Sequence, residues 1–381
     1  MFSNSIKLFT ISGFDIKIDF SWLLIAALIT WSLSKQFFPV SLPGLSQQTY
    51  FVMALLAMLC FFASLLLHEL AHSVVARRFG ISIKGITLFL FGGVAEFETE
   101  PKLASVEFWV ALAGPVMSLA LSFGFWVLAL FSEFAFDLPA LTEVLSYLAA
   151  INLVLALFNL LPAFPLDGGR VLRAYLWHRS GDLLRATETA AKSGTAFAYA
   201  LMALGVLALF QGVLIAGLWQ IMIGLFLLAA ARSSYQSQLA HVALENKTVS
   251  ELMTRNPIVA EPNMTLSEFV NQIMLPHRVS FVPVVEQDVL LGHMDQHILS
   301  GIDRENWGNT RISDVFAGLD KTTTIAPDMP AEKLLTVISD TKRRKFLVVQ
   351  GRTLVGVVSL ADLVRYLQVS EMLHGGRQPA R

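Results

Sequence analysis

The stretch "LLLHELAHSV", residues 65–74, decides how the chain is interpreted, because it sets ionisable residues at the end of an apolar segment. No charged residue occurs in residues 49–67, and His68, Glu69 and His72 follow directly. Ionisable side chains at membrane depth are costly and mark functional sites by default. Residues i and i+4 lie on one face of a helix, so the two histidines can bind one Zn²⁺ ion together. Glu69 lies beside them, where it can accept a proton from water held by the metal. The alternative is a polar cluster that only hydrogen-bonds to neighbouring helices.

The composition indicates a membrane protein with a soluble part. The chain has 381 residues, of which 55% are hydrophobic and 15% are charged, and its mean hydropathy is +0.60. A soluble domain carries about 25% charged residues. The net charge of −1 argues against a nucleic-acid partner. The single cysteine, Cys60, excludes an internal disulfide framework and a cysteine-rich zinc site.

Six membrane-spanning helices are expected, because a span needs about 20 mostly apolar residues. The last apolar segment has no charge over the 39 residues 193–231. As a helix it would be about 58 Å long, which is enough for two crossings, with Gln211 and Gly212 at the turn. The other four spans are expected at residues 20–33, 49–67, 108–132 and 144–166.

The basic residues of the loops predict the orientation of the chain in the membrane. Lysines and arginines gather in the loops after the second and fourth spans, and cytoplasmic loops carry such an excess. Both termini should therefore be cytoplasmic, and the histidines should lie near the cytoplasmic end of the second span. Residues 1–19 scatter apolar among polar residues, which favours one or two strands at the membrane surface over a cleaved signal peptide.

A β-hairpin is expected between the second and third spans. Residues 81–101 partly alternate in hydrophobicity and contain Gly92 and Gly93, which suit a turn. An unpaired edge of such a hairpin could accept an extended peptide by strand addition. It could also only brace the helices, and the pattern alone favours this second interpretation.

A third metal ligand is needed, because catalytic zinc usually takes three protein ligands and leaves one position for water. The other histidines fall in loops or in the soluble part. Asp167 follows the fourth span at the depth of the two histidines, with Pro162 and Pro165 before it and Gly168 and Gly169 after it, and these residues should break the helix. Irregular backbone at membrane depth is tolerated where it lines a wet cavity. Asp167 could also cap the next helix, but the unfilled metal position favours a ligand.

These residues carry a resemblance to a known family. The HExxH motif, "ALAGPVMS" at residues 111–118 and "FNLLPAFPLDGGR" at residues 158–170 resemble the site-2 protease family of intramembrane zinc metalloproteases. The resemblance implies that one Zn²⁺ ion is bound by His68, His72 and Asp167.

The resemblance also implies roles for residues around the metal. Glu69 would act as general base and acid, and Asn159 would help to stabilise the oxyanion of the tetrahedral intermediate. The hairpin at residues 81–101 resembles a β-element of the family proposed to engage substrate, which strengthens the case for strand addition.

Residues 246–369 have an ordinary soluble composition and repeat once. Each repeat is expected to hold a short helix, a small strand, a helix, two strands and a helix, and aligning Gly292 with Gly356 gives a period of 64 residues. Two such units should form one compact domain, since each alone would expose an apolar face. The predicted domains are a membrane domain at residues 1–245, repeats at 246–305 and 306–369, and a tail at 370–381.

The repeat resembles a pair of CBS domains. In "GVVSLADL", residues 356–363, Ser359 and Asp362 match a signature that contacts a nucleotide ribose in that family. The resemblance therefore implies an adenine nucleotide at this site. The first repeat departs from the signature, with Asp295 in place of Ser or Thr and Ile298 in place of Asp. A pair that only mediates dimerisation or docking is the open alternative.

The predicted fold is a polytopic α-helical membrane protein with short membrane-associated β-hairpins, followed by a soluble α/β CBS pair. The resemblances imply an intramembrane zinc endopeptidase that cuts transmembrane substrates in regulated intramembrane proteolysis. They place it in a bacterial or archaeal inner membrane, surrounded by the lipid bilayer, as a homodimer through its CBS domains. The alternatives are a catalytically silent protein that binds membrane clients and a CBS-linked transporter. An intact Glu69 argues against the first, and the set of His68, His72 and Asp167 argues against the second.

Overall fold

The chain divides into two compact units, Met1–Gln236 and Ser237–Arg381. The computed structural model describes residues 5–11, 13–89, 92–97 and 101–375.

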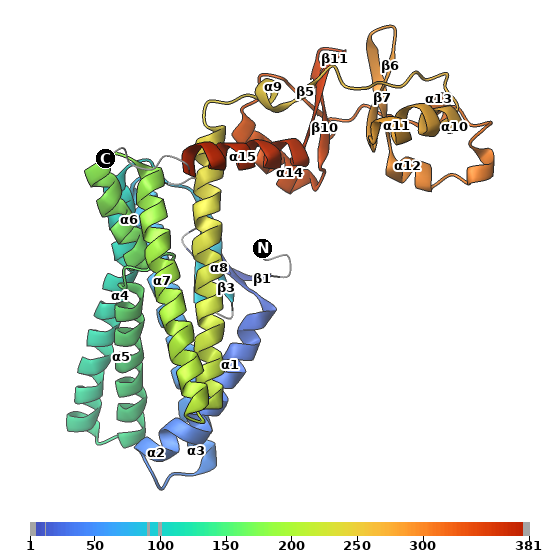
Figure 1. The fold of residues 1–381 in the computed structure, drawn as a ribbon. Coiled ribbons are helices and arrows are strands. Elements are labelled where there is room, and N and C mark those ends of the chain that lie inside the picture. The colour runs from blue at the N-terminus through green and yellow to red at the C-terminus, as the bar shows by residue number, and fades with distance from the viewer. Residues whose placement is uncertain (1–4, 12, 90–91, 98–100, 376–381) are drawn as a thin grey trace. The chain divides into compact units, whose positions relative to one another are not determined.

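Six helices of the described residues are long and apolar enough to cross a membrane, which confirms the predicted number. The last two meet at Gln211 and Gly212, where the turn was expected. Figure 1 shows these helices side by side. They are α1 (Phe20–Ser32), which continues through a π-helical turn into α2 (Phe38–Ser41), then α3 (Gln47–Arg78), α4 (Ala104–Phe131), α5 (Pro139–Asn159), α7 (Leu183–Phe210) and α8 (Leu214–Leu244).

Polar caps fix where three of these helices begin. The Asp19 side chain accepts a hydrogen bond from the backbone N–H of Ser21 at the start of α1. Ser46 caps α3 and Asp182 caps α7 in the same way. Such caps satisfy backbone donors that a helix cannot satisfy itself, which matters most where water is scarce.

The fourth span ends at Asn159 and not at Leu166 as predicted. Residues 160–166 leave the helix, and a separate helix, α6 (Asp167–Ser180), begins with Asp167. Pro162 and Pro165 lie in this break and supply no backbone N–H for a continuous helix. The Phe164–Pro165 peptide bond is cis.

The prediction that Gly168 and Gly169 break the helix is wrong. Both lie in the first turn of α6. A Cβ atom on Gly168 would overlap the Leu160 carbonyl, and one on Gly169 would overlap the backbone of Phe164. The two glycines therefore allow α6 to start directly against the preceding loop, which sets the position of Asp167.

The predicted N-terminal strands and the predicted hairpin exist, and they join in one sheet, which the sequence did not predict. Gly92 and Gly93 pair with Phe89 and Leu88 and so belong to a strand, not to the turn; residues 90–91 lie outside the described residues. The sheet runs β1-β2-β3-β4, with β2 and β3 parallel and the outer pairs antiparallel. Its strands are β1 (Ile6–Ile11), β2 (Phe14–Ile18), β3 (Ile83–Phe89) and β4 (Gly92–Phe97).

The sheet packs against the helix that carries the two histidines. Ile16, Ile86 and Leu88 of the sheet share a buried cluster with Phe62 and Leu65 of α3. The hairpin is thereby held beside the metal-binding motif.

The second unit begins with the last residues of α8 and continues with shorter helices and two small sheets. The strands are β5 (Thr254–Arg255), β6 (Phe281–Glu286), β7 (Val289–Asp295), β8 (Ala317–Gly318), β9 (Thr324–Ile325), β10 (Lys345–Gln350) and β11 (Thr353–Ser359). The helices are α9 (Val249–Leu252), α10 (Leu266–Glu268), α11 (Leu275–His277), α12 (Gln296–Ser300), α13 (Ile312–Val315), α14 (Ala331–Thr341) and α15 (Leu360–Gly375). A π-helical segment, Phe269–Met274, joins α10 to α11, and a 3₁₀ turn covers Arg304–Asn306.

The two repeats exchange strands. The four-stranded sheet runs β5-β11-β10-β9, so the small strand of the first repeat completes the sheet of the second. The three-stranded sheet runs β6-β7-β8, so the small strand of the second repeat completes the sheet of the first. The repeats therefore share their sheets as parts of one unit, and the predicted boundary at residues 305 and 306 stays a prediction.

The pairing of β7 with β8 requires a close approach of the two strands at Gly292, and replacing this glycine should weaken the pairing. A Cβ on Gly292 would overlap the Ala317 carbonyl of β8 and the Phe316 ring. Overpacking of this kind costs about 1–3 kcal/mol. We expect the backbone amides of β7 and β8 to exchange hydrogen faster in a Gly292→Ala variant of the full chain. Gly308→Ala, where a Cβ meets open space, is the matched control. Equal rates of amide hydrogen exchange in the two variants would contradict the expectation.

Candidate metal centre

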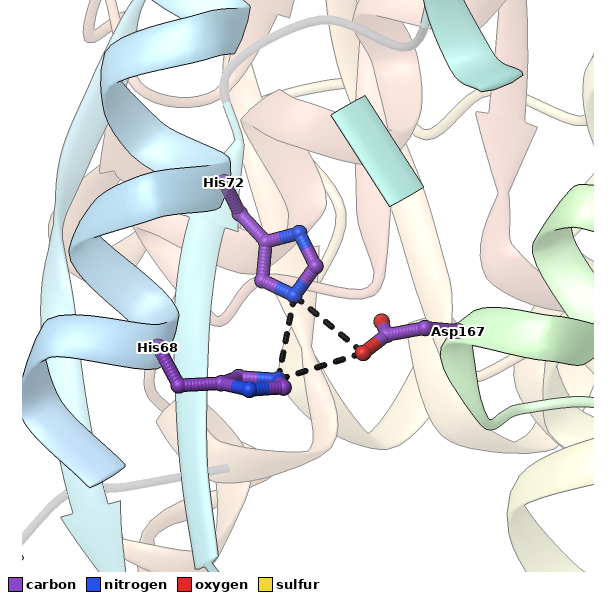
Figure 2. A group of neighbouring side chains, drawn as sticks. All are labelled: His68, His72 and Asp167. Atoms are coloured by element: carbon purple, nitrogen blue, oxygen red, sulfur yellow. Dashed lines mark hydrogen bonds and ion pairs between the residues drawn. The ribbon is translucent and has the colours of Figure 1, made fainter. Parts of the chain in front are cut away.

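Two buried histidines face each other on α3, one helical turn apart. His68 is 2% exposed and His72 is 4% exposed. Their Nε2 atoms lie 3.3 Å apart, and both rings point toward the start of α6, as Figure 2 shows. The i, i+4 spacing thus produces the shared face that the sequence predicted.

Hydrogen bonds to α4 orient both imidazole rings. The Nδ1 of His72 lies 2.6 Å from the Val110 carbonyl oxygen, which can only accept, so this nitrogen carries the proton. The Nδ1 of His68 lies 2.8 Å from the Ser118 hydroxyl. With the proton of His72 on Nδ1, its Nε2 keeps a lone pair for a metal. Partners of this kind are typical of metal-binding histidines.

Asp167 completes a three-ligand face. Its Oδ2 lies 3.1 Å from the Nε2 of His68 and 3.3 Å from the Nε2 of His72. Ligands about 2.0–2.1 Å from a tetrahedrally coordinated zinc ion stand roughly 3.3 Å from one another. The three atoms therefore fit one zinc ion, and these residues are a candidate metal group.

The three ligands line a cavity of about 540 Å³ that is mostly apolar. Glu69 and Asn159, the other two predicted site residues of the membrane domain, line the same cavity. Arg170, one turn beyond Asp167 on α6, is a further polar residue in its wall. The cavity leaves room for water beside the metal face. The apolar wall includes Phe61, Phe89, Leu155, Phe158, Trp219 and Phe226.

Two glycines bring backbone close to the ligands. A Cβ on Gly114 of α4 would overlap the Nε2 atoms of both histidines. A Cβ on Gly93 of β4 would overlap the Cγ of Glu69. Side chains at these positions would therefore disturb the metal face and the acid beside it.

Sequence reasoning missed how α4 serves the site. Val110, Gly114 and Ser118 contact the histidines, whereas the sequence motif at residues 111–118 indicates only a family resemblance and no contact. A signal was present in its spacing, because positions 110, 114 and 118 recur every four residues and so lie on one face of a helix.

In the second unit, Ser359 and Asp362 bind each other. Asp362 accepts from the backbone N–H and the hydroxyl of Ser359, and the Ser359 hydroxyl accepts from the backbone N–H of Asp362. These bonds begin α15 in the manner of a helix cap. Asp295, at the corresponding place in the first repeat, caps α12 through the N–H of Ile298.

A separate cleft of about 260 Å³ lies between the two repeats. Neither Ser359 nor Asp362 lines it. Burial lowers the pKa of Lys345 in its wall, while the nearby Asp295 opposes that shift. The cleft is lined by Ser280, Phe281, Asp295, Gln296, His297, Arg343, Arg344 and Lys345.

Comparisons with known families match both parts of the chain. Residues 56–139 and 136–205 match Peptidase family M50. Residues 249–293 and 313–369 match the CBS domain.

Similar proteins cover almost the whole chain. Rip3 of Mycobacterium tuberculosis is 36% identical over 368 residues, which is 96% of this chain and 93% of that protein. The zinc metalloprotease MJ0392 of Methanocaldococcus jannaschii is 31% identical over 369 residues, 97% of each chain. Among solved structures, the site-2 protease from Methanocaldococcus jannaschii is similar, with 29% identity, coverage of 60% of this chain and 94% of that one, and a TM-score of 0.42.

The close contact at Gly114 should be required for metal binding. Because a Cβ there would overlap both Nε2 atoms, we expect Gly114→Ala to weaken zinc binding by at least about tenfold, in line with changes next to metal ligands. Gly124→Ala on the same helix is the control, since a Cβ there meets open space. Zinc affinity in detergent, measured by competition with a chelator, checks this; equal affinity in the two variants would show that the contact does not matter.

Proposed function

From the premise that the chain belongs to Peptidase family M50, we propose that it cleaves peptide bonds within or next to transmembrane segments of other membrane proteins. The chain is an integral membrane zinc metalloprotease of the site-2 type with a CBS pair. The observation that carries the proposal is the set of three ligand atoms at tetrahedral spacing, in a cavity among membrane-spanning helices. Cleavage of this kind would serve regulated intramembrane proteolysis.

His68, His72 and Asp167 would hold the metal, and the remaining residues would handle protons and charge. A zinc ion at such a site supplies Lewis-acid activation of water and of the scissile carbonyl. Glu69 would accept a proton from the attacking water and deliver it to the leaving amide nitrogen. The oxygen of water bonds to the carbonyl carbon first, and the C–N bond of the resulting tetrahedral intermediate breaks afterwards. The products are a carboxylic acid and an amine, and the acid then gives its remaining proton to the amine or to solvent. The Asn159 side-chain amide would donate a hydrogen bond to the oxyanion.

The strand β4 offers a surface for the substrate. It is the last strand in the order of the described sheet, and its Gly93 packs against Glu69. An extended peptide added to this edge would therefore pass the general base. A transmembrane substrate is helical, so it must unwind locally before it can pair with a strand. This supports the interpretation of the hairpin as a substrate-binding element over that of a brace.

We propose that the CBS pair regulates the protease by binding an adenine nucleotide. The cleft between the repeats carries Arg343, Arg344 and Lys345, which suit phosphate groups, and Phe281, which suits an aromatic base. Ser359 and Asp362 would contact a ribose only at a second site, because they do not line this cleft. A pair that serves dimerisation alone remains the competing role.

We further propose a homodimer in the cell membrane of a prokaryote, with both termini and the CBS pair in the cytoplasm.

Two substitutions should separate the base from the ligands. Glu69→Gln should keep zinc but lower the cleavage rate by about 10²–10⁴-fold, as expected for general acid–base catalysis. Asp167→Ala should weaken zinc binding itself, because it removes one of three ligands. The measurement is cleavage of a single-span reporter in liposomes together with bound zinc. Glu133→Gln, at an exposed carboxylate, is the control; normal cleavage by Glu69→Gln would reject the mechanism.

The need for local unwinding predicts how substrates respond to helix breakers. Gly or Pro placed near the cut in a reporter segment should raise the cleavage rate, because each weakens the helix by about 1–3 kcal/mol. The same substitutions far from the cut should have little effect and serve as controls. Rates that do not depend on these residues would contradict cleavage of an unwound segment.

A further inference from the structure

A buried ion pair lies outside the metal centre and joins two of its supporting helices. Glu107 on α4 is 1% exposed, and Arg173 on α6 is 5% exposed. The Nε of Arg173 donates to the Glu107 carboxylate at 2.6 Å, and a second nitrogen of the guanidinium contacts the same oxygen. Burying two charges carries a large desolvation cost, so such a pair needs a reason to be there.

On the α4 side, the pair stands one turn from the residues that orient the histidines. Val110, three residues after Glu107, accepts the hydrogen bond from His72. Gly114 and Ser118 follow on the same face and contact the two imidazoles. The position of α4 therefore determines the orientation of both histidine ligands.

On the α6 side, the pair stands in the helix that begins with the third ligand. Arg173 lies six residues after Asp167 in α6. Its guanidinium also stacks on Phe164, with 5.1 Å to the ring centroid, and Phe164 belongs to the loop that leads into Asp167. The guanidinium thus contacts both segments that set the position of the carboxylate.

We propose that Glu107 and Arg173 are positioning residues of the metal centre. Their ion pair fixes α6 against α4 and so holds the Asp167 carboxylate at ligand distance from His68 and His72. A guanidinium fork is directional, whereas apolar contacts allow helices to slide over small distances. This inference rests on the proposed metal centre, and it assigns the pair a role in ligand geometry instead of overall stability.

A charge-free replacement distinguishes geometry from stability. Replacing a buried ion pair by apolar residues of similar volume is often neutral or stabilising. The double variant Glu107→Leu/Arg173→Met should therefore keep the unfolding temperature of the metal-free protein, yet bind zinc about 10–100-fold more weakly, as outer partners of metal ligands do. Arg173→Lys keeps the charge but loses the fork, and it should weaken zinc binding in the same direction.

The test uses the full chain in detergent, with zinc affinity measured by chelator competition and unfolding followed in parallel without metal. The exposed pair Glu188 and Lys192 on α7 supplies the control, Glu188→Leu/Lys192→Met, which should change neither value. Zinc affinity like that of the wild type in Arg173→Lys and in the double variant would overturn the inference. If the double variant does not fold, the zinc affinity of Arg173→Lys alone decides whether the ion pair positions the ligands. An unchanged zinc affinity in Arg173→Lys would then mean that the pair is purely structural.

Asp167→Ala separates this inference from the proposed function. If that variant loses zinc while the ion-pair variants keep it, only the positioning role fails. If Asp167→Ala also keeps zinc, the proposed metal centre itself is wrong, and the positioning role fails with it.

Discussion

Polar groups at membrane depth must find partners among themselves, and this constraint governs the packing of α3, α4 and α6. The two imidazoles of α3 present one nitrogen each to α4 and the other to Asp167 of α6. Every ring nitrogen is thereby engaged, and three helices meet at one point. The close approach of α4 is possible because Gly114 faces the imidazole rings. In α6, Gly168 and Gly169 face the backbone of the preceding loop, which allows the helix to start directly beside that loop.

The parts of this arrangement that follow from local patterns could be predicted from the sequence. The apolar runs gave six spans, and the i, i+4 spacing gave the shared face of His68 and His72. Asp167 was placed by its depth and by the break around it, and the structure brings it to both histidines. The predicted end of the fourth span at Leu166 is wrong, because hydropathy counts residues 160–166 as apolar and does not register that Pro162 and Pro165 interrupt the helix.

Contacts between distant segments could not be predicted in the same way. The parallel pairing of β2 with β3 joins residues about 70 positions apart, and the Glu107–Arg173 pair joins residues of two different helices. Nothing in hydrophobic periodicity reports which segments meet. The interpretation of Ser359 and Asp362 rested on a signature alone, and the structure shows a second use for the same residues, since they cap a helix. Helix capping and ligand binding favour the same residue types, because both need short polar side chains at a helix start.

The strand exchange in the soluble unit has a consequence for the order in which the chain is made. β5 at Thr254–Arg255 cannot pair until β11 at Thr353–Ser359 has been synthesised. In the same way, β7 cannot pair with β8 until β8 has been made. At a synthesis rate of about 5–20 residues per second, β5 is made roughly 5–20 seconds before β11. During that interval the membrane helices have already left the ribosome, while the first repeat still lacks its neighbour. The soluble unit thus closes only with the last segment of the chain, so a protein whose synthesis stops early has His68, His72 and Asp167 in place while the CBS pair is still incomplete.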